Sequence, residues 1–177
     1  MIQINEKDIM TELDFLNHHL YWFHAFKPGI KGKHQKGDIH SEFCNKDKVV
    51  ELCKKYNGKG ILCIAVNEHP KNSTKGEDVT KLNALLFDID VKKDLKEEYV
   101  SKEEHHQHAI NKAKNEIKTY LENMGFSVDL IVDSGNGCQL FSKLNLDIKD
   151  SNKREEFKQK ATVLETELRK FNDEIVD

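Results

Sequence analysis

The chain has 177 residues, of which 37% are hydrophobic and 33% charged, a balance typical of a soluble globular protein with one domain or one domain and an appendage. Its net charge of −3 excludes nucleic-acid binding through bulk charge, so any such contact needs a local basic surface. No apolar run approaches the ~20 residues of a membrane span and no secretory signal is visible, so we expect a cytoplasmic protein with no membrane partner. The four cysteines form no Cys-x-x-Cys pair, which indicates reduced thiols.

Residues 1–80 are predicted to form an N-terminal α/β part. Apolar residues recur at helical spacing from Ile9 to Phe23 and again from residue 46, whereas residues 61–66 form a continuous apolar run of strand length. Glycine and proline interrupt the segments between them. The predicted elements are a helix over 6–23, a loop over 27–36, a strand over 39–43, a helix over 46–56, a strand over 61–66 and a loop over 70–80.

Residues 81–177 are predicted to form the second part of the same compact domain. The pattern gives a strand over 83–90, a helix over 103–124 ended by Gly125, a hairpin of strands 127–132 and 138–144, and a helix over 151–171. This β-α-β-β-α order lacks one strand of a βαββαβ unit, the ferredoxin or RRM-like arrangement. The expected class is therefore α+β, with an RRM-like core truncated near Asp177.

Two acids end the predicted strand over 83–90. Because strand side chains alternate, Asp88 and Asp90 are expected on one face, with Phe87 and Ile89 packed on the other. Two carboxylates on one face repel unless a cation lies between them, and oxygen ligands suit Mg²⁺ or Mn²⁺. The alternative is a strand whose polar end faces water, because Asp-x-Asp alone is a weak motif.

A polar, glycine-containing turn follows at residues 134–137. Glycines allow backbone N–H groups to approach an anion, and Ser134 and Gln139 add side-chain donors. Such a turn suits a triphosphate bound beside metal ions at Asp88 and Asp90. An ordinary hairpin loop explains the glycines equally well.

Three motifs together resemble the archaeo-eukaryotic primase superfamily, with greatest similarity to the primase-polymerases of plasmids and phages. They are the apolar strand Leu85–Asp90 ending in Asp-x-Asp, the segment Ile131–Leu140 containing Ser-Gly-Asn-Gly, and an apolar residue followed by an acid at Val176-Asp177. The strand followed by asparagine at Cys63–Asn67 is also similar to the segment that precedes the metal strand in those proteins. The resemblance covers about residues 60–177.

The resemblance implies an RRM-like catalytic core that performs two-metal nucleotidyl transfer. In it, the catalytic and metal-binding acids are Asp88, Asp90 and Asp177, which hold two Mg²⁺ or Mn²⁺ ions about 4 Å apart. The implied nucleotide-binding residues are Ser134, Gly135, Asn136, Gly137, Gln139 and Lys143.

The sequence departs from the family pattern at two positions. Residue 139 is Gln where the superfamily usually has His, and glutamine donates a hydrogen bond but does not titrate. If that charge matters, a lysine such as Lys143 is the expected substitute. Asp177 is the last residue of the chain, and Asp173 is the alternative third ligand.

The segment over residues 27–36 is the most basic of the chain. Its lysines, Lys27, Lys31, Lys33 and Lys36, are candidate contacts for template phosphates, although a solvated loop explains them equally well. The aromatic residues Trp22, Phe23 and Phe26 just before it are candidates for base stacking, but such residues more often belong to a core.

The histidines do not predict a metal site. His105 and His108 share a helix face, but no cysteine or third ligand accompanies them, so zinc is not indicated. His18, His19 and His24 are expected on the first helix.

The sequence therefore predicts a DNA primase-polymerase domain of a plasmid, phage or other mobile element. Its expected partners are a single-stranded DNA template, deoxy- or ribonucleoside triphosphates, and a helicase domain or replication protein. The sequence does not distinguish de novo priming from primer extension, or deoxyribonucleotide from ribonucleotide substrates. Two alternatives remain: a non-catalytic RRM-like binding domain of a replication initiator, and a haloacid-dehalogenase-like phosphatase, whose first strand also ends in Asp-x-Asp.

Overall fold

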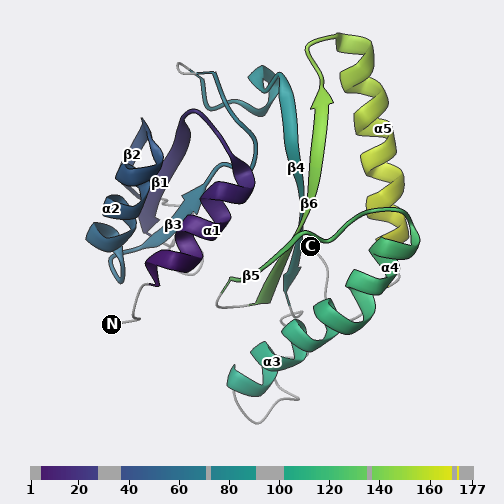
Figure 1. Ribbon diagram of the computed structural model, residues 1–177, viewed down its shortest axis with the longest axis horizontal. Coiled ribbons are helices and arrows are strands. Elements are labelled where there is room, and N and C mark those ends of the chain that lie inside the picture. Colours follow the sequence, from purple (N-terminus) through teal and green to yellow (C-terminus); the bar gives the residue numbers. More distant parts are fainter. Residues whose placement is uncertain are drawn as a thin grey trace. The chain divides into compact units, whose positions relative to one another are not determined.

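The computed structural model describes residues 5–27, 37–70, 73–90, 102–134, 137–168 and 171. The chain has the predicted α+β class, with two three-stranded sheets in the strand orders β2-β1-β3 and β4-β6-β5 (Figure 1). It divides into two compact units, Met1–Asn83 and Ala84–Asp177. Among the described residues, no helix has both the length and the apolar character needed to cross a membrane.

The first unit contains two helices and the sheet β2-β1-β3, in which β1 pairs with both neighbours in antiparallel fashion. The predicted helix over 46–56 is confirmed, as is the strand over 39–43, while the next strand is two residues shorter than predicted. The elements are α1 (Glu6–Leu16), β1 (Tyr21–Lys27), β2 (Gly37–Cys44), α2 (Lys46–Tyr56), β3 (Ile61–Ile64) and the 3₁₀ turn η1 (Gly76–Asp78).

The predicted helix over 6–23 was too long. Asn5 caps α1 by accepting from the Lys7 N–H at 3.1 Å, and Asn17 ends it in the left-handed conformation at φ 51°. From Tyr21 to Ala25 every second residue is buried, which is the period of a strand. The histidines expected on this helix therefore lie elsewhere: His18 and His19 follow α1, and His24 lies in β1.

The second unit follows the predicted order β-α-β-β-α. Its elements are β4 (Lys81–Asp90, which begins in the first unit), α3 (Lys102–Lys112), one π-helical turn η3 (Ala113–Ile117), α4 (Lys118–Asn123), β5 (Leu130–Asp133), β6 (Gly137–Asp147) and α5 (Ser151–Leu168). The predicted helix over 103–124 corresponds to α3, η3 and α4 in continuous succession, and Gly125, at φ 91°, follows them.

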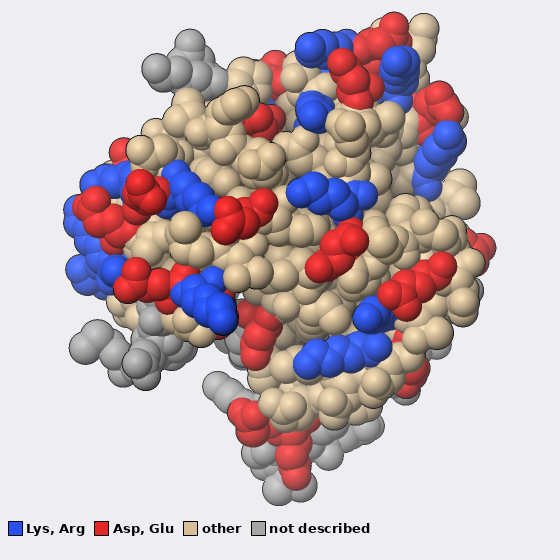
Figure 2. Space-filling view, in the orientation of Figure 1, with Lys and Arg blue, Asp and Glu red and all other residues tan. Residues whose placement is uncertain are grey.

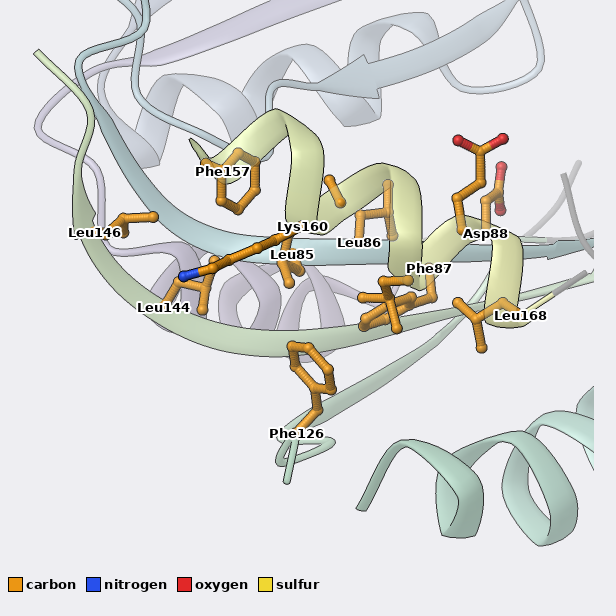
Figure 3. Close-up of a pocket in the computed structure, with 13 residues that line it drawn as sticks. Leu85, Leu86, Phe87, Asp88, Phe126, Leu144, Leu146, Phe157, Lys160 and Leu168 are labelled. Atoms are coloured by element: carbon orange, nitrogen blue, oxygen red, sulfur yellow. The ribbon is translucent and has the colours of Figure 1, made fainter. Parts of the chain in front are cut away.

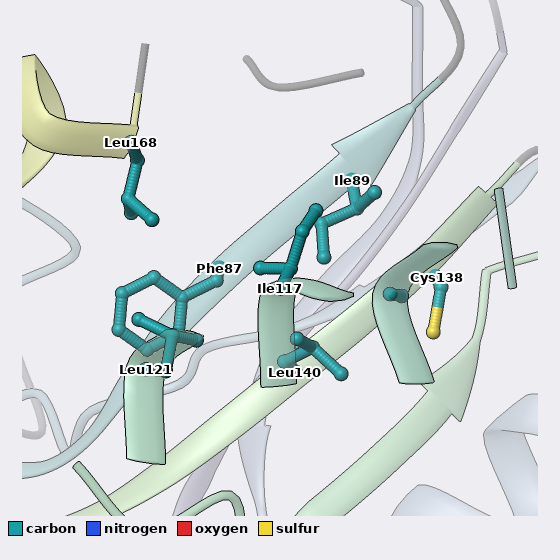
Figure 4. Close-up of a cluster of buried hydrophobic side chains, with 8 residues drawn as sticks. Phe87, Ile89, Ile117, Leu121, Cys138, Leu140 and Leu168 are labelled. Atoms are coloured by element: carbon teal, nitrogen blue, oxygen red, sulfur yellow. The ribbon is translucent and has the colours of Figure 1, made fainter. Parts of the chain in front are cut away.

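The hairpin of the second unit is confirmed, although its first strand begins at residue 130 instead of 127 and its second strand extends to residue 147 instead of 144. Strands β5 and β6 pair antiparallel from Leu130 opposite Phe141 to Asp133 opposite Cys138. Strand β6 also neighbours β4, and the two run in opposite directions (Figures 1 and 4).

One apolar cluster joins this sheet to its helices (Figure 4). Side chains from β4 and β6 contact those of η3, α4 and α5. The continuous helical segment η3–α4 and the helix α5 therefore pack on the same face of the sheet. The buried members are Phe87, Ile89, Ala113, Ile117, Leu121, Cys138, Leu140 and Leu168.

Candidate metal and nucleotide site

The acid-bearing end of β4 has the predicted alternation. Phe87 and Ile89 are 8% and 0% exposed and belong to the apolar cluster, whereas the Asp88 side chain is half-buried. Figure 3 shows the Asp88 carboxylate and the Phe87 ring pointing in opposite directions from the strand. Asp88 therefore projects from the face of β4 away from the cluster. Asp90 ends the strand, but its side chain lies outside the described part of the structure, so its place beside Asp88 stays a prediction.

The adjacent strand β6 presents Gln139 on the same face as Asp88. Cys138 and Leu140 belong to the same buried cluster as Phe87 and Ile89. Because side chains alternate, Gln139, which lies between them, projects from the opposite face, as Asp88 does. The two predicted site residues are thus brought to one face of neighbouring strands.

The turn before β6 is closed by Ser134. The Gly137 N–H donates to the Ser134 Oγ at 3.1 Å, and the Ser134 N–H donates to the Gly137 carbonyl at 3.3 Å. The Ser134 hydroxyl accepts in this turn and retains its own hydrogen for an external acceptor such as a phosphate oxygen. Gly135 and Asn136, also predicted to bind nucleotide, lie outside the described residues.

A histidine that the sequence analysis did not select ties α3 to this hairpin. The Nε2 of His106 lies 2.9 Å from the Oδ2 of Asp133, the last residue of β5. The side chain of His106 is 14% exposed and that of Asp133 58%. His105 and His108 were considered in the sequence because they share a helix face. The partner of His106 lies 27 residues further along the chain, so no local sequence pattern indicates this pair.

Charged groups surround the start of β6. Burial raises the pKa of the Cys138 thiol to about 11; Asp133 and Asp88 contribute to the rise, and Lys114 opposes it. Asp88 on β4 and Asp133 on β5 therefore both lie within electrostatic range of the residue that precedes Gln139. Because Asp133 is paired with Cys138 and bonded to His106 of α3, its side chain lies on the helical side of the sheet, opposite to Asp88 and Gln139.

Lys143 lies four residues beyond Gln139 on the same face of β6, about 13 Å away along the strand. Its side chain is exposed, and its backbone N–H donates to the Asp129 Oδ2 at 2.7 Å. The region between them is apolar, because Phe141 on this face is only 1% exposed. Of the two predicted nucleotide-binding residues of β6, Gln139 lies near the Ser134 turn and Lys143 lies far from it.

A pocket of about 490 Å³ lies between β4 and α5 (Figure 3). Most of its lining is apolar, from β4, from Leu144 and Leu146 of β6, and from α5. The polar groups that line it are Asp88, Lys160 and Glu165, and Lys160 is paired with Glu156 at 2.6 Å. This composition does not suit a triphosphate, so the sheet face that bears Asp88 and Gln139, next to the Ser134 turn, is the better candidate.

The donor set fits a divalent cation only in part. A carboxylate at Asp88, with the expected carboxylate of Asp90, is the oxygen ligation that Mg²⁺ and Mn²⁺ prefer. Among the side chains that the structure describes, no group of three His, Cys, Asp or Glu is close enough to hold a metal ion. Asp177, the predicted third ligand, and Asp173 lie outside the described residues.

A hydrogen-bond network that the sequence does not predict holds the start of β4. The Asn83 N–H donates to the Asn67 Oδ1 at 2.7 Å, and the Asn83 amide lies 3.2 Å from the Nδ1 of His18. The Nε2 of buried His18 lies 3.2 Å from the Ala65 carbonyl. Asn67, singled out by the resemblance, thus has a structural contact with the strand that bears the acids.

The predicted template contacts are mostly outside the described structure. Lys27 is exposed at the end of β1, whereas Lys31, Lys33 and Lys36 lie outside the described residues. On the face drawn in Figure 2, acidic and basic side chains are interspersed, in keeping with the net charge of −3.

No protein-family model matches the chain, and no curated protein or solved structure matches it either.

Proposed function

We propose that the chain is the catalytic domain of a DNA primase-polymerase, which transfers a nucleotide from a nucleoside triphosphate to a strand on a DNA template. The observation that supports this most is that Asp88 and Gln139 share one face of neighbouring strands, beside the Ser134 turn. Among the described residues, the strand order β4-β6-β5 with helices on one face is compatible with three strands of an RRM-like core.

In this proposal the residues act by placement and charge. Asp88 and Asp90 hold divalent ions, which would neutralise phosphate charge and favour ionisation of the attacking hydroxyl. The turn at Ser134 and the amide of Gln139 donate hydrogen bonds to the triphosphate and orient it. The 3′-oxygen forms a bond to the α-phosphorus, the bond from that phosphorus to the β-phosphate oxygen breaks, and pyrophosphate leaves.

The antiparallel order of the second sheet does not favour the phosphatase alternative, because that enzyme class needs a doubly wound parallel sheet. The non-catalytic binding domain differs from the proposal only in lacking the reaction. A product assay therefore separates the three functions.

The assay uses the full chain with single-stranded DNA, Mg²⁺ or Mn²⁺, and labelled deoxy- and ribonucleoside triphosphates. We expect template-dependent extension with release of pyrophosphate. Asp88→Asn should lower the rate at least about 100-fold, the scale of losing electrostatic stabilisation in a transition state. The matched control is Asp147→Asn on the same strand face as Gln139, about 26 Å further along β6. Release of orthophosphate alone, or extension that is equal in both variants, would contradict the proposal.

A further inference from the structure

The central strand of the first unit has two different faces. Tyr21, Phe23 and Ala25 are 2%, 0% and 0% exposed, whereas Trp22 and the alternate residues after it are half-buried. Both described helices of this unit pack on the buried side: the Tyr21 hydroxyl donates to the Leu13 carbonyl of α1 at 2.7 Å. The ring of Phe23 lies 6.3 Å from that of Tyr56 in α2. The other side of β1 is not part of that core.

That second side has a row of rings. Trp22, His24 and Phe26 succeed one another at two-residue spacing, about 7 Å apart along the strand. The centroids of Trp22 and His24 are 6.4 Å apart, and those of His24 and Phe26 are 5.1 Å apart. On the neighbouring strand β2, Phe43 is paired with Trp22, with ring centroids 4.8 Å apart. We call these four residues the aromatic face.

Two residues of the neighbouring strand β3 lie beside the aromatic face. Cys63 is paired with His24, and Ile61, which is 44% exposed, is paired with Phe26. The acid Asp38 of β2 accepts a hydrogen bond from the His24 Nε2 at 2.8 Å, so one carboxylate oxygen is already engaged. The Asp38 carboxylate therefore borders the ring of His24, with its side chain 70% exposed.

Described charges of both signs border the aromatic face, Asp38 on β2 and a lysine at the end of β1. Lys27 follows Phe26 directly, is exposed, and is paired with Gly37 across β1 and β2. In the sequence that joins those two residues there are three further lysines and no acid. A row of rings with the exposed Lys27 at its end complements a ligand that has flat apolar units on an anionic backbone.

We propose that the aromatic face binds single-stranded nucleic acid by stacking bases on Trp22 and Phe26. Unpaired bases expose their flat faces, whereas a duplex buries them, so this surface selects single strands. In the proposed function it would be where the template strand binds. It involves neither Asp88 nor metal, so binding is measurable apart from catalysis.

The test is a titration of the full chain with a fluorescein-labelled oligothymidylate in EDTA and without nucleotide. Trp22 is the only tryptophan of the chain, so a parallel titration with unlabelled oligothymidylate follows the emission of this residue alone. We expect quenching of that emission, and about tenfold weaker binding by anisotropy for Phe26→Leu and for Trp22→Leu. Phe15→Leu, a half-buried aromatic of α1, is the matched control and should bind like the wild type. Thermal melting of each variant separates loss of binding from loss of folding.

A footprint on Cys63 gives a second readout that needs no substitution. Because Cys63 is exposed and paired with the central His24, oligothymidylate should slow its alkylation, whereas the same sequence as a duplex should not. Unchanged Trp22 emission with unchanged alkylation would overturn the inference, even if the chain extends primers. Self-association that Phe26→Leu abolishes, without oligonucleotide binding, would also overturn it. Single-strand binding without strand synthesis would instead contradict the proposed function alone.

Discussion

The Nε2 of His106 in α3 lies 2.9 Å from the Oδ2 of Asp133, which ends β5 one residue before the Ser134 turn. The pair connects the helical layer to the hairpin that we assign to the triphosphate. Because His106 is mostly buried, its partner is the group that fixes the direction of the imidazole. The relationship makes His106 a positioning residue for the turn.

Replacing His106 should therefore weaken nucleotide binding without unfolding the protein. For His106→Ala we expect a KM for nucleotide raised several-fold at nearly unchanged kcat, with about 1 kcal/mol lost from the free energy of unfolding. Steady-state kinetics and urea unfolding measure the two. Gln107→Ala, an exposed neighbour on α3, is the control. A KM equal to that of the control would show that the pair does not position the turn.

Acid should destabilise the first unit through His18. Burial lowers the pKa of His18 below its ordinary value of 6.5, against smaller opposing effects of the Ala65 carbonyl and Glu68. The neutral ring donates from Nε2 to Ala65 and accepts at Nδ1 from the Asn83 amide, an arrangement that protonation of Nδ1 would break. The unfolded chain takes up a proton first as pH falls, so the free energy of unfolding should decrease from about pH 7 toward pH 5.

Urea unfolding followed by Trp22 emission across that range measures the effect. His18→Gln should reduce the pH dependence while lowering the stability at neutral pH, whereas exposed His19→Gln should leave both unchanged. Burial also lowers the pKa of His69, so part of the dependence should persist in His18→Gln. An identical slope in the wild type and His18→Gln would contradict the assignment.

Thiol reactivity should single out one cysteine. Burial raises the pKa values of Cys44, Cys53 and Cys138 to about 11, while Cys63 is exposed. The thiolate is the reactive form, so Ellman's reagent near neutral pH should titrate one thiol rapidly in the native chain and four after denaturation. Cys63→Ser should abolish the rapid phase. Rapid reaction of two or more native thiols would mean that the cores open readily.

Gly60 is predicted to tolerate no side chain. A Cβ there would lie 2.5 Å from the Phe26 carbonyl oxygen and 2.6 Å from the Cδ1 of Ile39. Gly60→Ala should therefore lower the free energy of unfolding by about 1–3 kcal/mol, measured in urea. Gly76→Ala, where a Cβ would meet nothing within 4 Å, should be neutral or slightly stabilising. Equal stability of both variants would contradict this geometry.

The spacing of apolar residues predicted those helices and strands in which that spacing continues without interruption. The apolar run before Asp88, the hairpin around Ser134 and the helix over 46–56 all follow from period and breakers, and the structure confirms them. The boundary between α1 and β1 was missed because Leu20 and Phe23 happen to continue the helical spacing. Asn17, a non-glycine residue in the left-handed conformation, ends the helix without the glycine that usually marks an end.

The contacts around the site were less predictable because they join distant segments. His106 meets Asp133 across 27 residues, and His18 meets Asn83 across 65. Neither pair has a spacing that sequence alone can read. The aromatic residues before Lys27 could not be assigned to the core or to the surface from the sequence, because β1 was not recognised as a strand. In the strand, Phe23 is buried, and Trp22 and Phe26 lie on the other side.

In the proposed function, Asp88 and the hairpin form one metal and nucleotide site. A Mn²⁺ titration of the full chain, followed by electron paramagnetic resonance with and without a non-hydrolysable deoxynucleoside triphosphate, tests it most directly. We predict Mn²⁺ binding that the nucleotide strengthens, that Asp88→Asn weakens at least about tenfold, and that Asp147→Asn leaves unchanged. Equal Mn²⁺ affinity in the wild type and Asp88→Asn, with nucleotide present, would show that Asp88 does not bind the metal.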